Sequence, residues 1–278
     1  MTTDSQLQAE KIYALQQSRV QKFRTGTTIS LIILLVLLIV AFSGIDLTGM
    51  GIPFRTIQLD SAFMRENAAY IIQGLGDTIL LAIVSIFLAG ALALLGALGR
   101  LSKFPPAYAI ATFYVSLIRG TPLLLQLFFF FLALPQLGIR LNGWTAGVLA
   151  LGINYGAYMS ETFRAGIQSV GQGQREAALA IGMNQRQILT RVVLPQALRI
   201  IIPPFGNDFI SMLKDTALVA ATGFVHEVLW RANTVGRQKF KSMETLLIAA
   251  LCYWAITIIF SALQTRLEAY LARGERGR

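Results

Sequence analysis

Long stretches without charge constrain this chain more than any other feature of its sequence. A transmembrane helix needs about 20 mostly apolar residues. Such stretches occur at 28–45, 78–99, 104–139 (interrupted only by Arg119), 141–160 and 245–265. A further stretch, 200–223, contains Asp208, Lys214 and Asp215. The pattern predicts an all-α polytopic membrane protein with about six transmembrane helices.

The composition excludes several other classes of protein. Charged residues make up 14% of the chain and hydrophobic residues 55%, whereas soluble domains average about 25% charged residues and disordered chains are polar and highly charged. The single Cys252 excludes a disulfide framework, and the single His226 leaves little basis for a metal site or for His-based catalysis. We therefore expect no metal and no catalytic residue.

The distribution of basic residues predicts the orientation. Six spans place both termini on one side of the membrane, and if that side is cytoplasmic, Lys and Arg are about twice as frequent inside as outside. The net charge of +10 then reflects cytoplasmic loops, and we expect no nucleic-acid partner. The external segment 231–241, which carries Arg231, Arg237, Lys239 and Lys241, is the exception.

The first apolar stretch, 28–45, has two interpretations. It could be a signal peptide with a cleavage site at 41–43, but a long polar lead-in that carries Lys11, Arg19, Lys22 and Arg24 precedes it. That lead-in favours a retained helix. We expect an accessory membrane anchor in which the helix faces lipid.

Ionisable residues within membrane spans are costly, by at least about 2.5–3.5 kcal/mol near the centre, and therefore suggest function. Candidates for a substrate site are Asp77, Arg119, Thr121, Asn154, Tyr158 and Glu161. Asn154, Tyr158 and Glu161 share one helix face by their spacing, which should avoid lipid. We expect Asp77 or Glu161 to select an ammonium or guanidinium group.

Each of these candidates also has a structural interpretation. Asp77 could be the N-cap of its helix, and Glu161 could pair with Arg164 at i, i+3 spacing. Pro122 should break its helix, and Arg119 could satisfy the carbonyl groups freed there. Lys214 and Asp215 are adjacent and cannot face one another, so we expect them to act in gating or at a dimer seam.

The polar segment 164–199 is predicted to form short amphipathic helices. We expect one helix that begins after an N-cap at Ser169 and ends at Gly182 in a left-handed backbone conformation. A second should run from Asn184 to Leu194 and end at Pro195. Such helices are suited to docking into a groove of another protein or to lying on the bilayer surface.

The spacing within this segment resembles the EAA loop of ABC-importer membrane subunits. Glu176-Ala177-Ala178 is followed by three residues, Gly182, nine residues, Val192, one residue and Leu194-Pro195. In the family pattern Ile stands where this chain has Val192. The resemblance implies that the following residues couple the chain to an ATPase: Glu176, Ala177, Ala178, Gly182, Val192, Leu194 and Pro195.

Four other segments, 119–124, 161–167, 194–199 and 213–216, are similar to those of polar amino-acid uptake permeases, and the similarity runs from about Tyr70 to Ala262. It implies a type I importer fold with a five-helix core, to which this chain adds its first helix. It also implies a second permease subunit, two cytoplasmic ATPase subunits that hold ATP and Mg²⁺, an extracytoplasmic binding protein and a bacterial inner-membrane location.

These observations predict three parts: residues 1–67 with the accessory helix, a permease core at 68–265 with the coupling loop 166–199, and a tail at 266–278. The expected function is that of a non-enzymatic permease for an ATP-driven amino-acid importer. The alternative is an ion-coupled secondary transporter, although no internal repeat is evident. The sequence leaves the amino acid undetermined.

Overall fold

The computed structural model describes residues 2–45 and 56–273, and all regular structure in this part of the chain is helical. The α-helices are α1 (Thr2–Ala41), α2 (Ser61–Ile72), α3 (Gly74–Leu101), α4 (Pro105–Arg119), α5 (Leu123–Phe128), α6 (Gly143–Ser169), α7 (Gln172–Ala180), α8 (Gln185–Gln187), α9 (Leu194–Asp215), α10 (Val228–Lys239) and α11 (Ser242–Arg273). Turns of 3₁₀ or π-helix occupy Phe129–Ala133, Leu134–Leu137, Ile188–Val193 and Thr216–Thr222.

The chain divides into two units, and the first is Met1–Ser61. Its helix α1 ends at Ala41, not at Ile45 as expected. The stretch Arg19–Ala41 is long and apolar enough to cross a membrane, and its apolar side chains are exposed. Positions 46–55 of the expected external loop, and 274–278 of the expected tail, lie outside the described residues.

The second unit, Ala62–Arg278, is built around α3 and α6. These helices run side by side in the same direction, because Gly147 of α6 lies against Leu81 and Ser160 lies against Gly96 of α3. Small residues permit the close approach: a Cβ at Gly156 would lie 2.8 Å from the Leu92 side chain. Close packing through small residues is typical of membrane helices.

Four helical segments of the described chain are long and apolar enough to cross a membrane: Arg19–Ala41, Ser61–Leu101, Gln185–Thr222 and Ser242–Leu271. The bent pair α4–α5 and its following turns would make a fifth. The predicted span 141–160 corresponds to α6, which is not among them. Its Gly, Asn and Tyr residues lower its hydropathy, and α6 tolerates them because much of its surface is buried against protein.

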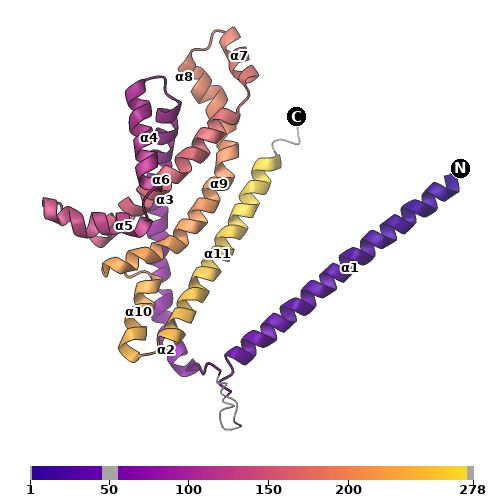
Figure 1. Cartoon of the computed structure of the whole chain (residues 1–278), viewed down its shortest axis with the longest axis vertical. Helices are drawn as coiled ribbons and strands as arrows, with labels where there is room; N and C mark the ends of the chain where they lie inside the picture. The colour runs from indigo at the N-terminus through magenta and orange to yellow at the C-terminus, as the bar shows by residue number, and fades with distance from the viewer. Residues whose placement is uncertain (1, 46–55, 274–278) are drawn as a thin grey trace. The chain divides into compact units, whose positions relative to one another are not determined.

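The helices give the second unit two distinct ends, as Figure 1 shows: α7 and α8 lie at one, and α2 and α10 at the other. The prediction that Pro195 ends a helix is wrong. The chain continues from the π-helical turn into α9, where Pro195 occupies the first turn. The first turn of an α-helix is the position at which proline is tolerated.

Candidate functional site

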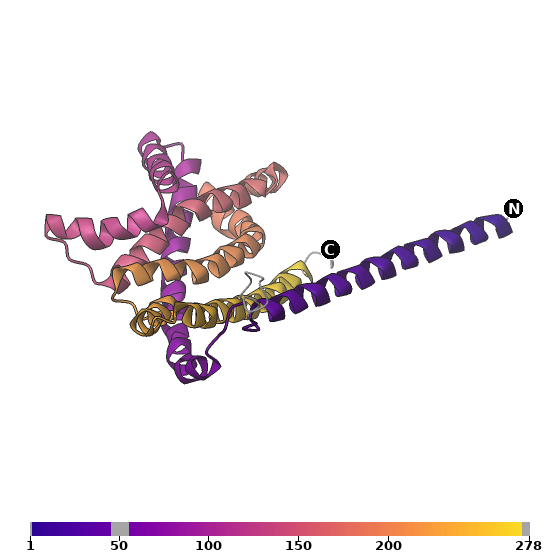
Figure 2. The ribbon, with the colours of Figure 1, turned by 60° about the horizontal axis from the view of Figure 1, so that its bottom comes forward.

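The break between α4 and α5 shapes the candidate site. The two helices meet at 105°, and α5 leads away from α4 in both views (Figures 1 and 2). The break follows from Pro122, which precedes the first residue of α5 and adopts an extended conformation (ψ 140°). The predicted interruption of the helix is therefore confirmed.

Gln126, not Arg119, satisfies the groups freed at the break. Its side-chain amide donates hydrogen bonds to the carbonyl oxygens of Ile118 (2.9 Å) and Thr121 (3.1 Å) and lies 2.9 Å from the Thr121 hydroxyl. Its own carbonyl accepts a hydrogen bond from the Asn154 amide (3.2 Å). Thr121 and Asn154 are thus linked, and the break is fixed against α6.

A cavity of about 340 Å³ opens beside this link. Its lining comes from the break, from α6 and from α9: Thr121, Pro122, Leu123, Asn154, Tyr155, Tyr158, Asp208, Ser211 and Asp215. Three of the residues predicted for substrate binding, Thr121, Asn154 and Tyr158, therefore line one cavity. Asp215, which we expected in gating or at a dimer seam, lines it too.

Two carboxyl groups from α9 give the cavity its acidic character. Asp215 accepts a hydrogen bond from the Tyr155 hydroxyl at 2.8 Å, whereas Asp208 has no hydrogen-bond partner among the described residues. Neither forms an ion pair with a Lys or Arg in that part of the chain. A carboxylate in a medium of low dielectric attracts a cation strongly. The cavity can therefore hold a positively charged group.

Arg119 and Lys214 lie outside the cavity lining. The Arg119 guanidinium lies over the Tyr158 ring, 5.1 Å from its centroid, and a cation in that position is attracted by the ring. Tyr158 itself lines the cavity, so this ring links Arg119 to the lining. Lys214 is exposed.

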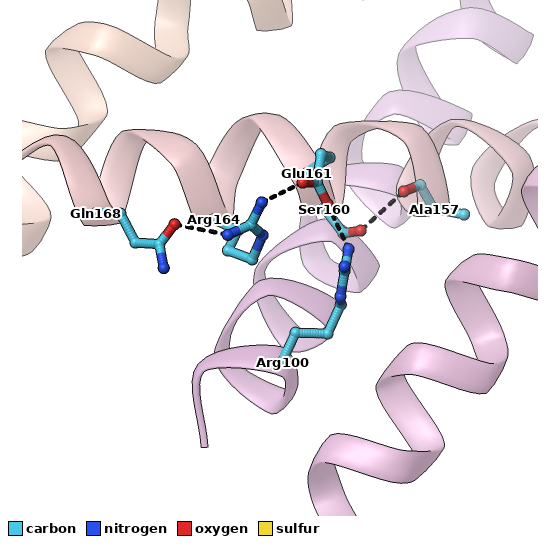
Figure 3. A network of polar contacts seen from close by, with 6 residues as sticks. All are labelled: Arg100, Ala157, Ser160, Glu161, Arg164 and Gln168. Carbon is cyan, nitrogen blue, oxygen red and sulfur yellow. Dashed lines mark hydrogen bonds and ion pairs between the residues drawn. The ribbon is translucent and has the colours of Figure 1, made fainter. Parts of the chain in front are cut away.

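Glu161 belongs to a separate cluster at the end of α6, which Figure 3 shows. Each of its carboxylate oxygens accepts a hydrogen bond from a guanidinium group, one from Arg100 of α3 and the other from Arg164. Arg164 also donates to Gln168 at 2.6 Å. The expected pairing with Arg164 is confirmed, and Arg100 extends it to α3. Glu161 does not line the cavity.

Asp77 lies in the first turn of α3 and is not the N-cap, which is Gln73. It lies near Glu227, the fully buried N-cap of α10, whose carboxylate accepts hydrogen bonds from Leu229, Trp230 and Tyr253. Burial raises the pKa of Glu227, and the neighbouring Asp77 adds to the effect. Asp77 is not part of the cavity lining either.

The loop of α7 and α8 forms much as predicted. Gly182 has a φ of +81°, and the amide of Met183 bonds back to the carbonyl of Ala178 (3.1 Å), so the left-handed helix end is confirmed. The N-cap is Gly171 and not Ser169. Three side chains are exposed here, Glu176 and Leu179 of α7 and Ile181 at its C-cap, so α7 and the turn after it present one acid and two large apolar side chains on their surface.

Four lining or supporting residues were not predicted from the sequence: Gln126, Tyr155, Asp208 and Ser211. Asp208 carried a signal, because it is an ionisable residue that interrupts an apolar stretch. Gln126 is a polar residue within the apolar sequence 123–133, and a polar residue at such a position is expected to face protein or a cavity. The meeting of α9 with the break could not be read from spacing within either segment.

Comparison with known proteins identifies similar chains. A family model described as binding-protein-dependent transport system inner membrane component matches residues 89–273. The L-cystine transport system permease protein TcyB of Bacillus subtilis (strain 168) is 42% identical over 205 residues, 72% of this chain and 87% of the relative. The arginine transport system permease protein ArtQ of the same organism is 35% identical over 216 residues, 77% of this chain and 98% of the relative.

Solved structures give the same picture. A crystal structure of an amino acid ABC transporter with histidines contains a chain with 36% identity and a TM-score of 0.71, and the match covers 77% of this chain and 100% of that one. An inward-facing structure of the MetNI methionine ABC transporter matches with a TM-score of 0.62 at 17% identity, over 77% of this chain and 99% of that one. The second likeness concerns the fold alone.

Proposed function

The chain belongs to the family of binding-protein-dependent transport system inner membrane components. We propose that it imports an amino acid and that the cavity between α5, α6 and α9 holds the positive charge of that amino acid. The chain is an amino-acid permease subunit of an ABC transporter with the type I importer fold. Its family places it in the inner membrane. The identity of the amino acid and the coupling to ATP are the parts that we propose.

The observation that carries the substrate proposal is that two carboxylates in the lining of the cavity, those of Asp208 and Asp215, have no ion-pair partner in residues 2–45 and 56–273. An amino acid carries both an ammonium and a carboxylate group, so a complete site needs both signs of charge. Asp208 and Asp215 provide the negative side, and Arg119, stacked over Tyr158, provides the positive one at the edge. A substrate with a cationic side chain gains most from this arrangement.

Uptake by the reconstituted importer tests this proposal. The permease, its ATPase and its binding protein are placed in lipid vesicles, and uptake of labelled amino acids is measured with and without ATP. We expect transport only with ATP, and strongest for amino acids with a cationic side chain. Equal transport of acidic and cationic amino acids would contradict the proposed selectivity, and transport driven by an ion gradient alone would contradict the coupling to ATP.

Coupling to the ATPase is proposed to run through α7 and the turn at Gly182. Support comes from the exposed surface of α7, where Glu176 and Leu179 project, and from the match of this loop to the EAA pattern. The proposed coupling segment also includes Ala177, Ala178, Val192, Leu194 and Pro195. Within this segment Ala178 and Val193 are buried, and they hold α7 against the body of the permease.

A charge change on α7 tests the coupling. Replacing Glu176 with Lys should weaken binding of the ATPase at least tenfold, because it reverses the charge that would meet basic residues of the partner. Gln174→Lys, which places a positive charge on another exposed position of α7, serves as the matched control and should bind normally. Equal binding by both variants and the native chain would contradict a docking role for Glu176.

The remaining partners follow from the same proposal. The importer would contain two permease subunits, of this chain or of a homologue, two ATPase subunits that bind ATP and Mg²⁺, and an extracytoplasmic binding protein. Both termini would be cytoplasmic, and α1 would act as an accessory anchor. Lys214, which is exposed on α9, would lie at the seam between the permease subunits.

A further inference from the structure

The tip between α10 and α11 has an unusual local structure. Phe240, which caps the end of α10, has a φ of +55°, and it is the only residue other than glycine with a positive φ in the described part of the chain. Its side chain is 95% exposed. A bulky side chain is disfavoured in the left-handed region, and an exposed aromatic ring gains nothing from burial. Folding alone therefore gives no reason for phenylalanine at this position.

Several contacts hold the turn that carries Phe240. The amide of Lys241 bonds to the carbonyl of Gly236 (2.9 Å), and a Cβ at Gly236 would lie 2.3 Å from the Thr245 hydroxyl oxygen. Thr245 is fully buried. The Lys241 ammonium lies over the ring of Phe63 in α2, 5.0 Å from its centroid. The tight turn and the contact with α2 hold the aromatic side chain outward.

The length of the neighbouring helical segment indicates that the tip lies beyond the hydrocarbon core of the membrane. The helical segment Ser61–Leu101 has 41 residues and spans about 60 Å at ~1.5 Å per residue, roughly twice the ~30 Å of the core. The tip contacts the start of this segment, where Arg65 and Glu66 are exposed. Charged residues at that level favour water over lipid around the tip.

Basic residues lie close to Phe240 in the sequence. Arg237 and Lys239 are exposed on the last turn of α10, and they belong to the segment that breaks the expected charge bias between the two sides of the membrane. The end of the unit that carries α7 is the opposite one (Figure 1). Aromatic residues and Arg are enriched in protein interfaces, which are polar at the rim, so the exposed Phe240 ring beside Arg237 and Lys239 suits an interface.

We propose that Phe240, flanked by Arg237 and Lys239, is an anchor for the extracytoplasmic binding protein, whose docking surface offers an apolar socket with an acidic rim. The inference rests on the proposed function, which places α7 in the cytoplasm and the tip outside. The basic residues increase the rate of encounter with the acidic surface, and the ring fills the socket.

Phe240→Gly is the decisive variant because it removes the ring and also relieves the backbone, since glycine adopts a positive φ without cost. The complete importer is reconstituted in lipid nanodiscs, and its affinity for the purified, substrate-loaded binding protein is measured together with its thermal midpoint. We expect the affinity to fall at least tenfold while the midpoint stays equal or rises. Phe240→Tyr should keep the affinity within about threefold of the native value.

A second arm tests the charge. Lys239→Glu should slow association about tenfold at low salt and much less at high salt, because surface charges are screened. Arg140→Glu, an equal charge change on an exposed residue in the loop before α6, is the control and should change the rate less than twofold. Equal slowing by both variants would overturn the specific role of the tip.

The outcomes separate this inference from the proposed function. If no amino-acid-loaded binding protein stimulates ATP hydrolysis by the native importer, the proposed function fails. If the native importer is stimulated but Phe240→Gly binds the binding protein with native affinity, the docking inference is overturned, and the ring would then contact lipid headgroups.

Discussion

Carboxylates occupy two regions of α6 and its neighbours in different ways. At the end of α6, Glu161 is held by two guanidinium groups, those of Arg100 and Arg164. In the cavity, Asp208 and Asp215 face open space, and only a tyrosine hydroxyl bonds to one of them. A carboxylate that is already neutralised positions helices, whereas one without a cationic partner is available to a ligand. The difference separates a structural acid from candidate substrate-binding acids.

The largest expected effect is on transport when the cavity loses its charge. The double substitution Asp208→Asn and Asp215→Asn keeps the shape of both side chains and removes both charges. We expect kcat/KM for uptake of a cationic amino acid to fall at least a hundredfold, because about 2.7 kcal/mol of attraction is lost. Assembly with the ATPase, followed by size-exclusion chromatography, should stay intact. Uptake within threefold of native would contradict a role in substrate binding.

The next effect is on stability when the structural acid is removed. Glu161→Ala leaves the guanidinium groups of Arg100 and Arg164 without their partner in a partly exposed site, which should cost about 1–2 kcal/mol after solvent screening. We expect the thermal midpoint of the purified complex to fall by several degrees. In the double variant Arg100→Gln and Glu161→Gln, part of this loss should be recovered. If none of these substitutions changes the thermal midpoint, Glu161 does not stabilise the fold.

The contrast between the two regions could be predicted only in part from sequence. The i, i+3 spacing of Glu161 and Arg164 sufficed to predict their pair, because both lie on one helix, and Pro122 sufficed to predict the break. Arg100 and Glu161 are far apart in sequence and meet only because α3 and α6 pack in parallel. The place of Asp208 in the cavity could not be predicted for the same reason. Periodicity places residues on a face of their own helix, but it does not say which other helix lies opposite that face.

A smaller effect is expected when one hydrogen bond of the cavity is removed. Tyr155→Phe deletes the hydroxyl that donates to Asp215 at 2.8 Å and leaves the ring in place. Without that bond the Asp215 side chain is less fixed, and a net hydrogen bond to a charged group contributes about 1.5–3 kcal/mol. We expect KM for a cationic amino acid to rise three- to tenfold with little change in kcat. A change in kcat alone would indicate a role in gating instead.

The smallest effect concerns Glu227, which shows that lack of a cationic partner does not by itself make a carboxylate a ligand site. Glu227 is fully buried, and its carboxylate accepts hydrogen bonds from two backbone amides and from the Tyr253 hydroxyl. Because its pKa is raised above the ordinary value of 4.5, its contribution to stability is present at low pH and declines as pH rises through the folded pKa.

Glu227→Gln should therefore flatten the dependence of the thermal midpoint on pH over that window. The midpoint of the native complex, measured from pH 4 upward, should fall more steeply than that of the variant. Identical pH dependence in the two proteins would show that Glu227 keeps its charge in the fold, and uptake selectivity should be unchanged in either case.

The central claim is that the acids in the cavity, not the acid at the end of α6, read the charge of the substrate. Its most direct test is the uptake ratio of a cationic amino acid to a neutral amino acid of similar length, measured for Asp208→Asn and for Glu161→Gln in the same reconstituted importer. We predict that the ratio falls at least tenfold in Asp208→Asn and stays within twofold of native in Glu161→Gln. A ratio that falls in Glu161→Gln and not in Asp208→Asn would show that Glu161, and not Asp208, senses the charge of the substrate.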